Sequence, residues 1–470
     1  MADPAAYILS LQNNIRQRPI SWEGAVRAKT ISDADLKAIK SIDKVRTEQR
    51  KETIESDSKT YCSLLLGGGG QRSIFESAAK RQDIIQYMLV LAGDVLEDVP
   101  EFAETLIKHP DPYAHLLPFL KQPSNLEEPI ALLASTLITR LLSPAIDTKG
   151  APKVSETLPV VYKYLSSLSK TSDAGLQDIA VQHYTNLLKN TASRKIFWDL
   201  RSETVAPLFE ILKTAGGAAS KDSSSILSTP TAASVGGVSL QLLYHVLFVI
   251  WKLSFDGETL GDGLDDEYDL IPLYVSLVRI SPKEKTTRLL LATLVNLLNS
   301  NPASLLPAAA LAHLHPAVKS VQSRHLTDPE LLDDLATLLT LLEDHAKSQT
   351  TFDLYAAEVR GGHLRWSPPH RSAMFWAENA RRVLEENRGE LPQQLAEILG
   401  RDWEGDTQVL AIGCNDVACL VKEVPEARSK LERWGLKGRV MALMEHRDGL
   451  VRSESLRALG EWFRYTGTLN

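Results

Sequence analysis

Four short stretches decide the fold of this chain: Leu117-Pro118-Phe119-Leu120, Leu158-Pro159-Val160-Val161, Ala206-Pro207-Leu208-Phe209 and Ile271-Pro272-Leu273-Tyr274. In each, an apolar residue and a proline open an apolar run. The four prolines stand 41, 48 and 65 residues apart. The widest gap contains a low-complexity stretch of about 24 residues, without which it returns to roughly 41, the repeat length of HEAT and armadillo proteins. The spacing therefore predicts a helical-repeat array.

The residues after each proline support this repeat. Proline suits the first turn of a helix, because the N–H that it lacks would have no partner there, so each proline is predicted to start a short helix. A polar turn follows, and then a longer helix with apolar residues on one stripe at i, i+3, i+4 and i+7. The four stripes are Ala134, Leu137, Ile138, Leu141 and Leu142; Ala180, Tyr184, Leu187 and Leu188; Leu243, Val246, Leu247 and Ile250; and Leu290, Leu294, Leu297 and Leu298. The predicted fold is all-α, a HEAT/armadillo-like helical-repeat solenoid in two domains.

Outside the repeat helices, local composition predicts one helix and three irregular segments. Ser32 to Ser56 is expected to be one long polar helix, since Ser32 precedes acidic residues and a narrow apolar stripe. Gly67 to Gly70 is expected to be a flexible break before a helix that begins near Ser73. The segment 214–237, rich in serine, glycine, alanine and threonine, is expected to be a disordered insertion. Gly257 to Asp269 is expected to be an acidic loop.

The domain boundary is predicted near residue 352. After His345 the spacing of apolar residues changes, and five of the eight tryptophans follow. These five are Trp366, Trp376, Trp403, Trp434 and Trp462. We predict an N-terminal helical-repeat domain of residues 1–352 and a C-terminal helical-repeat domain of residues 353–470.

Composition and charge exclude several classes of function. The 470 residues are 44% apolar with a net charge of −7, so the basic excess typical of nucleic-acid binding is absent and no nucleic-acid partner is expected. Three cysteines, Cys62, Cys414 and Cys419, lack metal-binding spacing and cannot all pair, which indicates a reducing compartment. The first residues lack a signal sequence, and no run of 18 uninterrupted apolar residues occurs. We expect a cytosolic protein without direct membrane insertion.

Three motifs that resemble ligand sites each have a simpler interpretation. The glycines at 67–70 are followed by Gln71-Arg72-Ser73 and not by the Gly-Lys-Ser/Thr of a phosphate-binding loop, so a hinge is favoured over an anion site. The acidic residues of 257–269 are out of register with an EF-hand, which favours a solvated loop over a calcium site. His313 and His315 have no Cys or carboxylate at zinc-ligand spacing, so two surface histidines are favoured.

No nucleophile motif is recognisable either. Gly-x-Ser-x-Gly does not occur, and neither Cys414 nor Cys419 has a basic context that would favour a thiolate. Both cysteines lie in the apolar segment 409–421 and are expected to pack there. The sequence predicts no catalytic residue, no cofactor site and no metal site.

The tryptophans are divided by their surroundings. Trp376, Trp434 and Trp462 stand at helix-stacking positions and are assigned to the core. Trp403 lies in the polar, glycine-bounded stretch 400–406, and exposed aromatic and arginine residues are enriched in binding hot spots. We predict a partner interface there, formed by Arg401, Asp402, Trp403 and Glu404. The alternative is a Trp403 side chain folded back onto the neighbouring helix.

The C-terminal segment resembles a known family. Leu364-Arg365-Trp366-Ser367-Pro368-Pro369-His370 followed by Phe375-Trp376-Ala377-Glu378-Asn379 is similar to the "L-x-W-S-P-x-H … F-W-x-E-N" block of the H subunit of the vacuolar proton-pumping ATPase (V-ATPase). Two later stretches, 434–444 and 451–456, resemble that family's "G-x-K-x-x-V-M-x-L-M" and "V-R-x-E-A-L". In the N-terminal part, residues 20–23, 31–33, 244–255, 283–288 and 291–294 fit the family as well. Trp366 and Phe375 of the first block are added to the predicted partner interface.

The resemblance implies a non-catalytic regulatory subunit of the V1 sector, needed by the assembled pump and inhibiting ATP hydrolysis by detached V1. It implies that the N-terminal domain binds the E and G subunits of the peripheral stalk, and that the C-terminal domain contacts the a subunit of the membrane sector. After detachment, the C-terminal domain would bridge the catalytic-sector B subunit and the central rotor. The protein would then be peripheral on the cytosolic face of vacuolar membranes and endomembranes, through the ATPase complex.

Two other classes remain open at this point. A generic armadillo-type cytosolic adaptor would bind peptide segments of partner proteins, but the Trp376 and Asn379 pair is isolated and wrongly spaced for a peptide-binding ladder. An enzyme is the weakest alternative, because no acid, base, nucleophile and ligand set is clustered.

Overall fold

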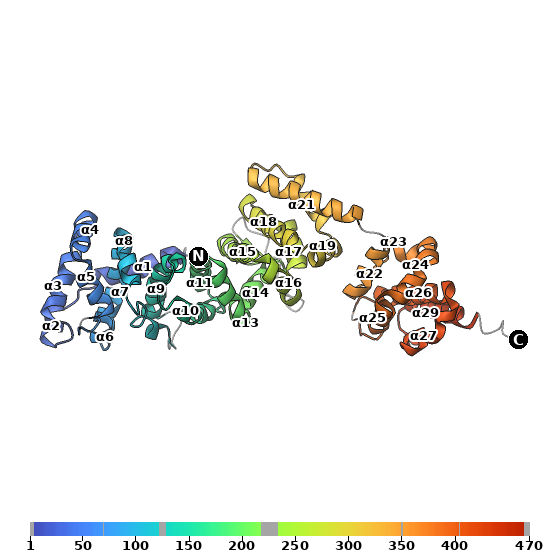
Figure 1. Cartoon of the computed structure of the whole chain (residues 1–470), viewed down its shortest axis with the longest axis horizontal. Coiled ribbons are helices and arrows are strands. Elements are labelled where there is room, and N and C mark those ends of the chain that lie inside the picture. Colours follow the sequence, from blue (N-terminus) through green and yellow to red (C-terminus); the bar gives the residue numbers. More distant parts are fainter. Residues whose placement is uncertain are drawn as a thin grey trace. The chain divides into compact units, whose positions relative to one another are not determined.

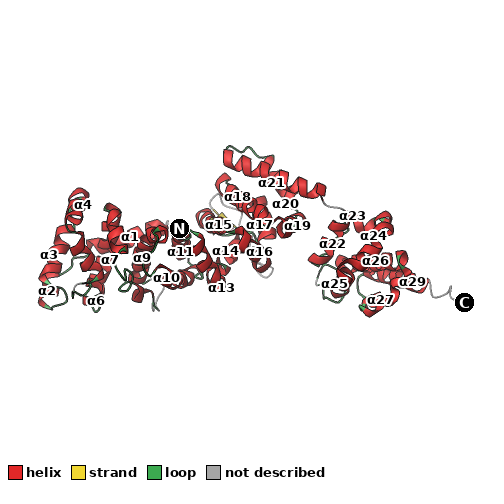
Figure 2. Cartoon of the chain, viewed as in Figure 1, coloured by secondary structure: helices red, strands yellow, loops and turns green. Residues whose placement is uncertain are grey.

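A computed structural model describes residues 4–68, 70–121, 128–217, 234–348, 351–403 and 405–464. Within these ranges nearly all regular structure is helical, and the only strands are the short antiparallel pair β1 (Ser234–Val235) and β2 (Val238–Ser239) (Figure 2). The predicted all-α helical-repeat fold is confirmed. The chain divides into two compact units, Met1–Leu338 and Leu339–Asn470.

The N-terminal unit is built from helices joined by short turns (Figure 1). Its helices are α1 (Pro4–Gln17), α2 (Trp22–Arg27), α3 (Asp33–Ile42), α4 (Thr47–Ser56), α5 (Ser58–Leu66), α6 (Ile74–Ser77), α7 (Gln82–Asp98), α8 (Glu101–Ile107), η1 (Leu117–Leu120), α9 (Pro129–Asp147), α10 (Val154–Ser169), α11 (Ala174–Leu187), α12 (Thr191–Asp199), α13 (Arg201–Thr204), α14 (Ala206–Ala215), α15 (Leu240–Ser254), α16 (Gly257–Tyr268), α17 (Leu270–Ile280), α18 (Glu284–Ser300), α19 (Pro302–Leu311), α20 (Leu314–Gln322) and α21 (Pro329–Ser348), which crosses the division between the units.

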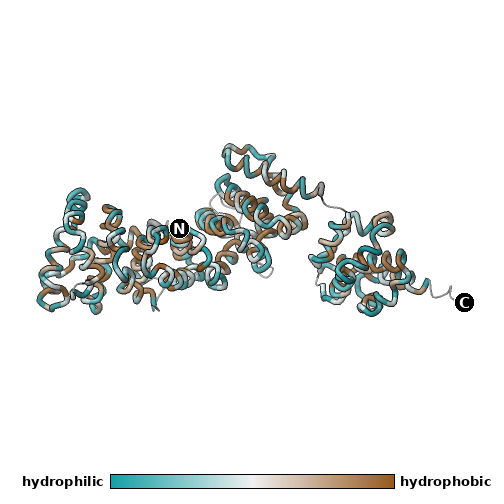
Figure 3. The backbone as a smooth tube through the Cα atoms, viewed as in Figure 1, coloured by the Kyte–Doolittle hydropathy of each residue, from teal (hydrophilic) through white to brown (hydrophobic). Residues whose placement is uncertain are grey.

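The predicted apolar stripes form the core of this unit. Successive long helices α7, α9, α11, α15 and α18 pack side by side, and every residue of the four stripes is buried. Along these helices the tube in Figure 3 alternates between brown and teal, as expected of helices with one apolar face. Each fully buried leucine stabilises the stack by about 1.5–3 kcal/mol. One described helix, α9, has the length and apolar composition of a membrane span, but 67% of that window is buried inside the unit, as in a core helix.

The four repeat prolines have different positions in their helices. Pro118 and Pro207 occupy the first positions of η1 and α14, as predicted, and Pro272 lies in the first turn of α17. Pro159 is an exception because it lies inside α10. The helix is already formed there, since the amide of Thr157 donates to the carbonyl of Lys153 at 3.0 Å. The prediction that each proline starts a helix is therefore wrong for Pro159.

The predicted single helix from Ser32 to Ser56 is also wrong. It begins as expected, with a capping box between Ser32 and Asp35, but α3 ends at Ile42 and α4 starts at Thr47. Between them Lys44 has a positive φ of 53°. Contacts with other elements favour this break: the Asp43 carboxylate accepts from the Tyr87 hydroxyl of α7 at 2.6 Å, and the Arg50 guanidinium donates to the Ile42 carbonyl at 2.9 Å.

The predicted acidic loop at 257–269 is a helix, α16. Its glycines, which suggested a loop, allow close packing instead. A Cβ atom on Gly257 or Gly261 would lie less than 3.0 Å from side chains at the end of α18, and one on Gly263 would lie 2.6 Å from the Trp198 ring. Most of the predicted insertion, residues 218–233, lies outside the described residues.

The C-terminal unit has its own core, centred on the packing of α26 against α29. Its helices are α22 (Thr351–Gly361), α23 (Pro368–Arg371), α24 (Ala373–Glu385), η2 (Glu386–Arg388), α25 (Glu390–Ile398), α26 (Gln408–Glu423), η3 (Pro425–Ala427), α27 (Arg428–Arg433), α28 (Leu436–Ala442), η4 (Leu443–Glu445) and α29 (Gly449–Arg464). Trp376 and Trp462 are buried core residues as predicted, while Trp434 is half-buried against the core. Phe352, at the predicted boundary, is buried in this core.

Candidate partner-binding sites

The residues of the predicted interface loop differ in their exposure to solvent. Arg401 and Asp402 are exposed. Trp403 is half-buried: its indole N–H donates to the carbonyl of Ile398 at 2.9 Å, and its ring meets His363 edge to face with centroids 5.0 Å apart. The Trp403 side chain therefore packs against the C-terminal core, and the side chains of Arg401 and Asp402 face solvent. Glu404 lies outside the described residues, and the interface role of the loop stays a prediction.

The two residues taken from the family block differ in accessibility. Trp366 is half-buried, with the Arg371 guanidinium 5.1 Å from its ring centroid. Phe375 is only 3% exposed and packs against Tyr355 and Trp376. Because its ring is enclosed in the core, Phe375 does not present a surface to a partner, and its assignment to the interface is corrected.

A buried polar cluster, which the sequence pattern did not predict, lies behind this block. Short helix α23 brings His370 into the core between α22 and α26. Its Nδ1 lies 2.8 Å from Asp416 Oδ2, and its Nε2 lies 3.0 Å from Glu358 Oε2. The Asn415 amide donates to the His370 carbonyl at 2.9 Å, and Arg457 of α29 donates to Asn415 Oδ1. The imidazole thus joins α23 to α22 and α26, and Asn415 extends the cluster to α29.

The charges of this cluster follow from its burial and its carboxylates. Burial alone would lower the pKa of His370, but the charges and hydrogen bonds of Asp416 and Glu358 outweigh it and raise the pKa to about 9. Burial raises the pKa of the fully enclosed Asp416, and the positive imidazolium opposes that shift. His370 is therefore a cation at neutral pH, held between two carboxylates.

This arrangement supports structure and not chemistry. The carboxylates of Asp416 and Glu358 face opposite nitrogens of the ring, so no single point is shared by all three groups. Among the described residues, no group of three His, Cys, Asp or Glu side chains is arranged to hold a metal ion. His370 is 1% exposed, which leaves no room for a substrate at its ring. A signal was present in the sequence: Asp416 interrupts the apolar segment 409–421, and a buried carboxylate requires a cationic or hydrogen-bonding partner.

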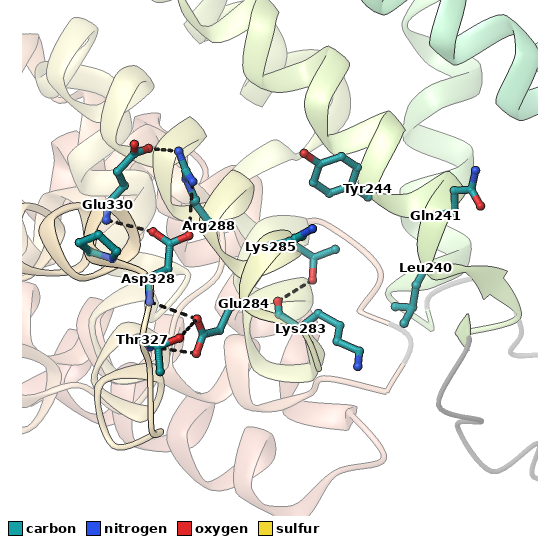
Figure 4. A pocket seen from close by; sticks show the side chains of 12 residues that line it. Leu240, Gln241, Tyr244, Lys283, Glu284, Lys285, Arg288, Thr327, Asp328 and Glu330 are labelled. Carbon is teal, nitrogen blue, oxygen red and sulfur yellow. Dashed lines mark hydrogen bonds and ion pairs between the residues drawn. The ribbon is translucent and has the colours of Figure 1, made fainter. Parts of the chain in front are cut away.

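A groove of about 790 Å³ lies in the N-terminal unit, where the N-terminal ends of α15, α18 and α21 approach one another (Figure 4). Arg288 is paired with Asp328 at 3.3 Å and with Glu330. The Glu284 carboxylate accepts from the amide and hydroxyl of Thr327, both at 3.0 Å.

Two lysines of this groove have no such partner. The side chains of Lys283 and Lys285 are exposed, and neither has an ion-pair partner among the described residues. The groove therefore presents two exposed ammonium groups without an ion pair beside the side chains of Leu240 and Tyr244, with the Glu284 carboxylate between them in sequence.

Comparison with known proteins identifies the family. The family model for the V-ATPase H subunit matches residues 6–342 with its N-terminal part and residues 348–466 with its C-terminal part. The chain belongs to the family of V-ATPase H subunits. The V-type proton ATPase H subunit of Drosophila melanogaster is 26% identical over 455 residues, which are 95% of this chain and 87% of that protein.

A second relative is similar over a comparable length. The probable V-type proton ATPase H subunit of Oryza sativa subsp. japonica is 27% identical over 469 residues, 96% of this chain and 95% of that protein. Among solved structures, an engineered protein aligns over 98% of this chain with 13% identity and a TM-score of 0.37. The family's similarity thus spans both units.

Proposed function

We propose that this protein is a non-catalytic regulatory subunit of the V1 sector of a vacuolar proton-pumping ATPase. The observation that carries the proposal is that both parts of the family model match the chain in order. The N-terminal part matches residues 6–342 and the C-terminal part matches residues 348–466. Relatives named as this subunit are matched over most of their length. In this role the protein is peripheral on the cytosolic face of vacuolar membranes and endomembranes and associates with them through the complex.

The two units are assigned different roles in this proposal. The N-terminal unit binds the E and G subunits of the peripheral stalk. The C-terminal unit contacts the a subunit of the membrane sector in the assembled pump and, in detached V1, bridges the B subunit and the central rotor so that ATP hydrolysis stops. Separate cores support this division, because a unit with its own core keeps its fold while its contacts change.

The test is ATP hydrolysis by detached V1 with and without the full chain. We expect the protein to suppress hydrolysis, and unchanged hydrolysis would contradict the proposal. A double substitution, Arg401→Ala with Asp402→Ala, is expected to weaken suppression, because both side chains are exposed while the core contact of Trp403 is kept. Arg433→Ala with Glu385→Ala removes one exposed arginine and one exposed acidic residue elsewhere in the same unit. This control variant should leave suppression unchanged. Capture of transport cargo in place of ATPase subunits would favour the generic armadillo-type adaptor.

A further inference from the structure

Four aromatic side chains form a stripe on α15 and at its end. Tyr244, Phe248, Trp251 and Phe255 follow the spacing i, i+4, i+7 and i+11, which places them on one face of the helix. Their ring centroids are 6.2, 5.1 and 4.8 Å apart from one ring to the next. The stripe is continuous over three turns, a length of roughly 16 Å.

This aromatic stripe lies outside the buried face of α15. That face carries the residues of the third repeat stripe together with Leu242, Val249 and Leu253. The flanks are tied to neighbours: the Lys252 ammonium donates to the Thr185 carbonyl of α11 at 2.8 Å, and Asn296 of α18 donates to Ser254 at 2.9 Å. The aromatic rings themselves are partly exposed, and Phe255 is 55% exposed.

The four rings form one continuous row in which Tyr244, Phe248 and Trp251 are partly exposed and Phe255 is exposed. Contiguous exposed apolar surface on a protein marks an interaction site. Tryptophan and tyrosine are also the residues most enriched among binding hot spots. The indole N–H of Trp251 has no acceptor among the described residues, so it is available to a bound partner.

The long helices α7, α9, α11, α15 and α18 form a row, and another helix of the same chain packs against this row. Helix α1 packs against both α7 and α11, two helices of the same row. It does so with Ile15 and Gln12 buried and with the Arg16 guanidinium bound to the Asp94 carboxylate of α7. The next helix in the row after α11 is α15. Helix α1 therefore already lies against two helices of the row, the second of which packs against α15.

Charge distinguishes the two ends of the stripe. Tyr244 lines the groove that contains the unpaired ammonium groups of Lys283 and Lys285 (Figure 4). Beyond Phe255 the chain enters α16, whose exposed side chains include Glu258. A partner helix is thus complementary when its acidic end lies over the two lysines.

We infer that the aromatic stripe docks an amphipathic helix of a partner protein, with the partner's apolar face on the four rings and its acidic residues over Lys283 and Lys285. This inference rests on the proposed function, in which the N-terminal unit binds the stalk subunits. It deepens that function by naming the surface and the chemistry of the segment bound. An apolar helix face against aromatic anchors is a recurring mode of peptide recognition.

The test measures the affinity of the full-length chain for purified E–G heterodimer, used as the probe. Trp251→Ala with Phe255→Ala is expected to weaken binding by about 30-fold or more, the loss typical of aromatic hot spots. Lys283→Glu with Lys285→Glu is expected to weaken it by roughly 10-fold, with a smaller dependence on salt. Ile280→Ala with Leu311→Ala removes exposed apolar side chains from α17 and α19 and should leave affinity unchanged. Circular dichroism and the urea midpoint show that each variant is folded.

The outcomes separate this inference from the function on which it rests. If the wild-type chain does not bind the heterodimer, the proposed stalk binding is wrong and the inference falls with it. If the wild type binds and the Trp251 and Phe255 variant binds equally well, only the docking surface is wrong. Equal weakening by the control variant on α17 and α19 would also overturn the surface, because binding would then depend on exposed apolar area in general.

Discussion

His183 in the N-terminal unit and His370 in the C-terminal unit are both buried, but their neighbours differ. Thr136 Oγ1 lies 3.3 Å from His183 Nε2, and Thr136 donates its own proton to the Leu132 carbonyl at 3.0 Å, so the imidazole N–H donates to the threonine. Burial, helped by the charge of Arg140, lowers the pKa of His183 to about 4. This imidazole is neutral at pH 7.

His370 differs in charge because two carboxylates face its ring, and they outweigh the effect of burial. The comparison shows that burial alone does not decide the charge of a histidine; the charges packed against it do. It also gives the two units opposite pH dependence. A buried histidine that is neutral in the folded state destabilises the fold in acid, because it must become protonated. A charged histidine held by carboxylates loses its contribution to stability in alkali, because it must lose its proton.

The largest effect is expected from Asp416→Ala. This change leaves the imidazolium of His370 buried with Glu358 alone, and removing one partner of a buried ion pair typically lowers the free energy of unfolding by about 3–5 kcal/mol. Urea unfolding of the full chain measures this loss of free energy, with hydrogen exchange in α26 as the probe of the C-terminal unit. Asp406→Ala removes an exposed carboxylate of the same unit and is the control. Equal stability of both variants would show that the cluster does not hold the C-terminal unit together.

The stability of the C-terminal unit is expected to fall with rising pH. The folded-state pKa of His370, about 9, exceeds the unfolded value of about 6.5, so its contribution is complete below pH 6.5 and is lost as pH rises toward 9. Between pH 5.5 and 8.5 we expect a loss of about 2–3 kcal/mol. Hydrogen exchange in α26 at several pH values measures this loss. A flat profile would mean that His370 is not charged.

The N-terminal unit is expected to show the reverse. The folded-state pKa of His183, about 4, lies below the unfolded value, so its contribution is complete above about pH 6.5 and is lost as pH falls toward 4. At pH 5 the expected loss is about 2 kcal/mol relative to pH 7.5. Hydrogen exchange in α11 measures it, with His183→Gln as the variant that should lose this acid dependence. Retention of the full dependence in that variant would assign it to another group.

The two units also show what the sequence could predict. The apolar stripes of α9, α11, α15 and α18 were predictable because helical periodicity is local. The helix break at Lys44 was not predictable, because the neighbouring Asp43 carboxylate accepts a hydrogen bond from Tyr87 of α7, which is 44 residues away in sequence. Likewise, glycines at 257–263 indicated a loop when considered alone, whereas in the fold they allow α16 to approach α18 and Trp198.

The candidate sites show the same limit. His370 and Asp416 are 46 residues apart in sequence, and Trp403 meets His363, so neither contact follows from local pattern. The polar composition of the loop at 400–406 correctly predicted exposure of Arg401 and Asp402, but composition could not show that the tryptophan between two polar neighbours turns inward. The family was predictable because its motifs are contiguous, and the block at 364–379 contains His370 without revealing its buried partner.

The smallest expected effect, from Glu358→Gln, separates the two carboxylates that hold His370. The substituted amide still offers an acceptor to Nε2, so the hydrogen bond is kept while one negative charge is removed. We expect a loss of about 1 kcal/mol at pH 6, the difference between charged and neutral hydrogen bonds. The alkaline loss of stability should also begin at a lower pH, because the pKa of His370 moves toward its ordinary value. If only the size of the loss changes and its pH range does not, Asp416 alone sets the charge of His370, and Glu358 contributes a hydrogen bond.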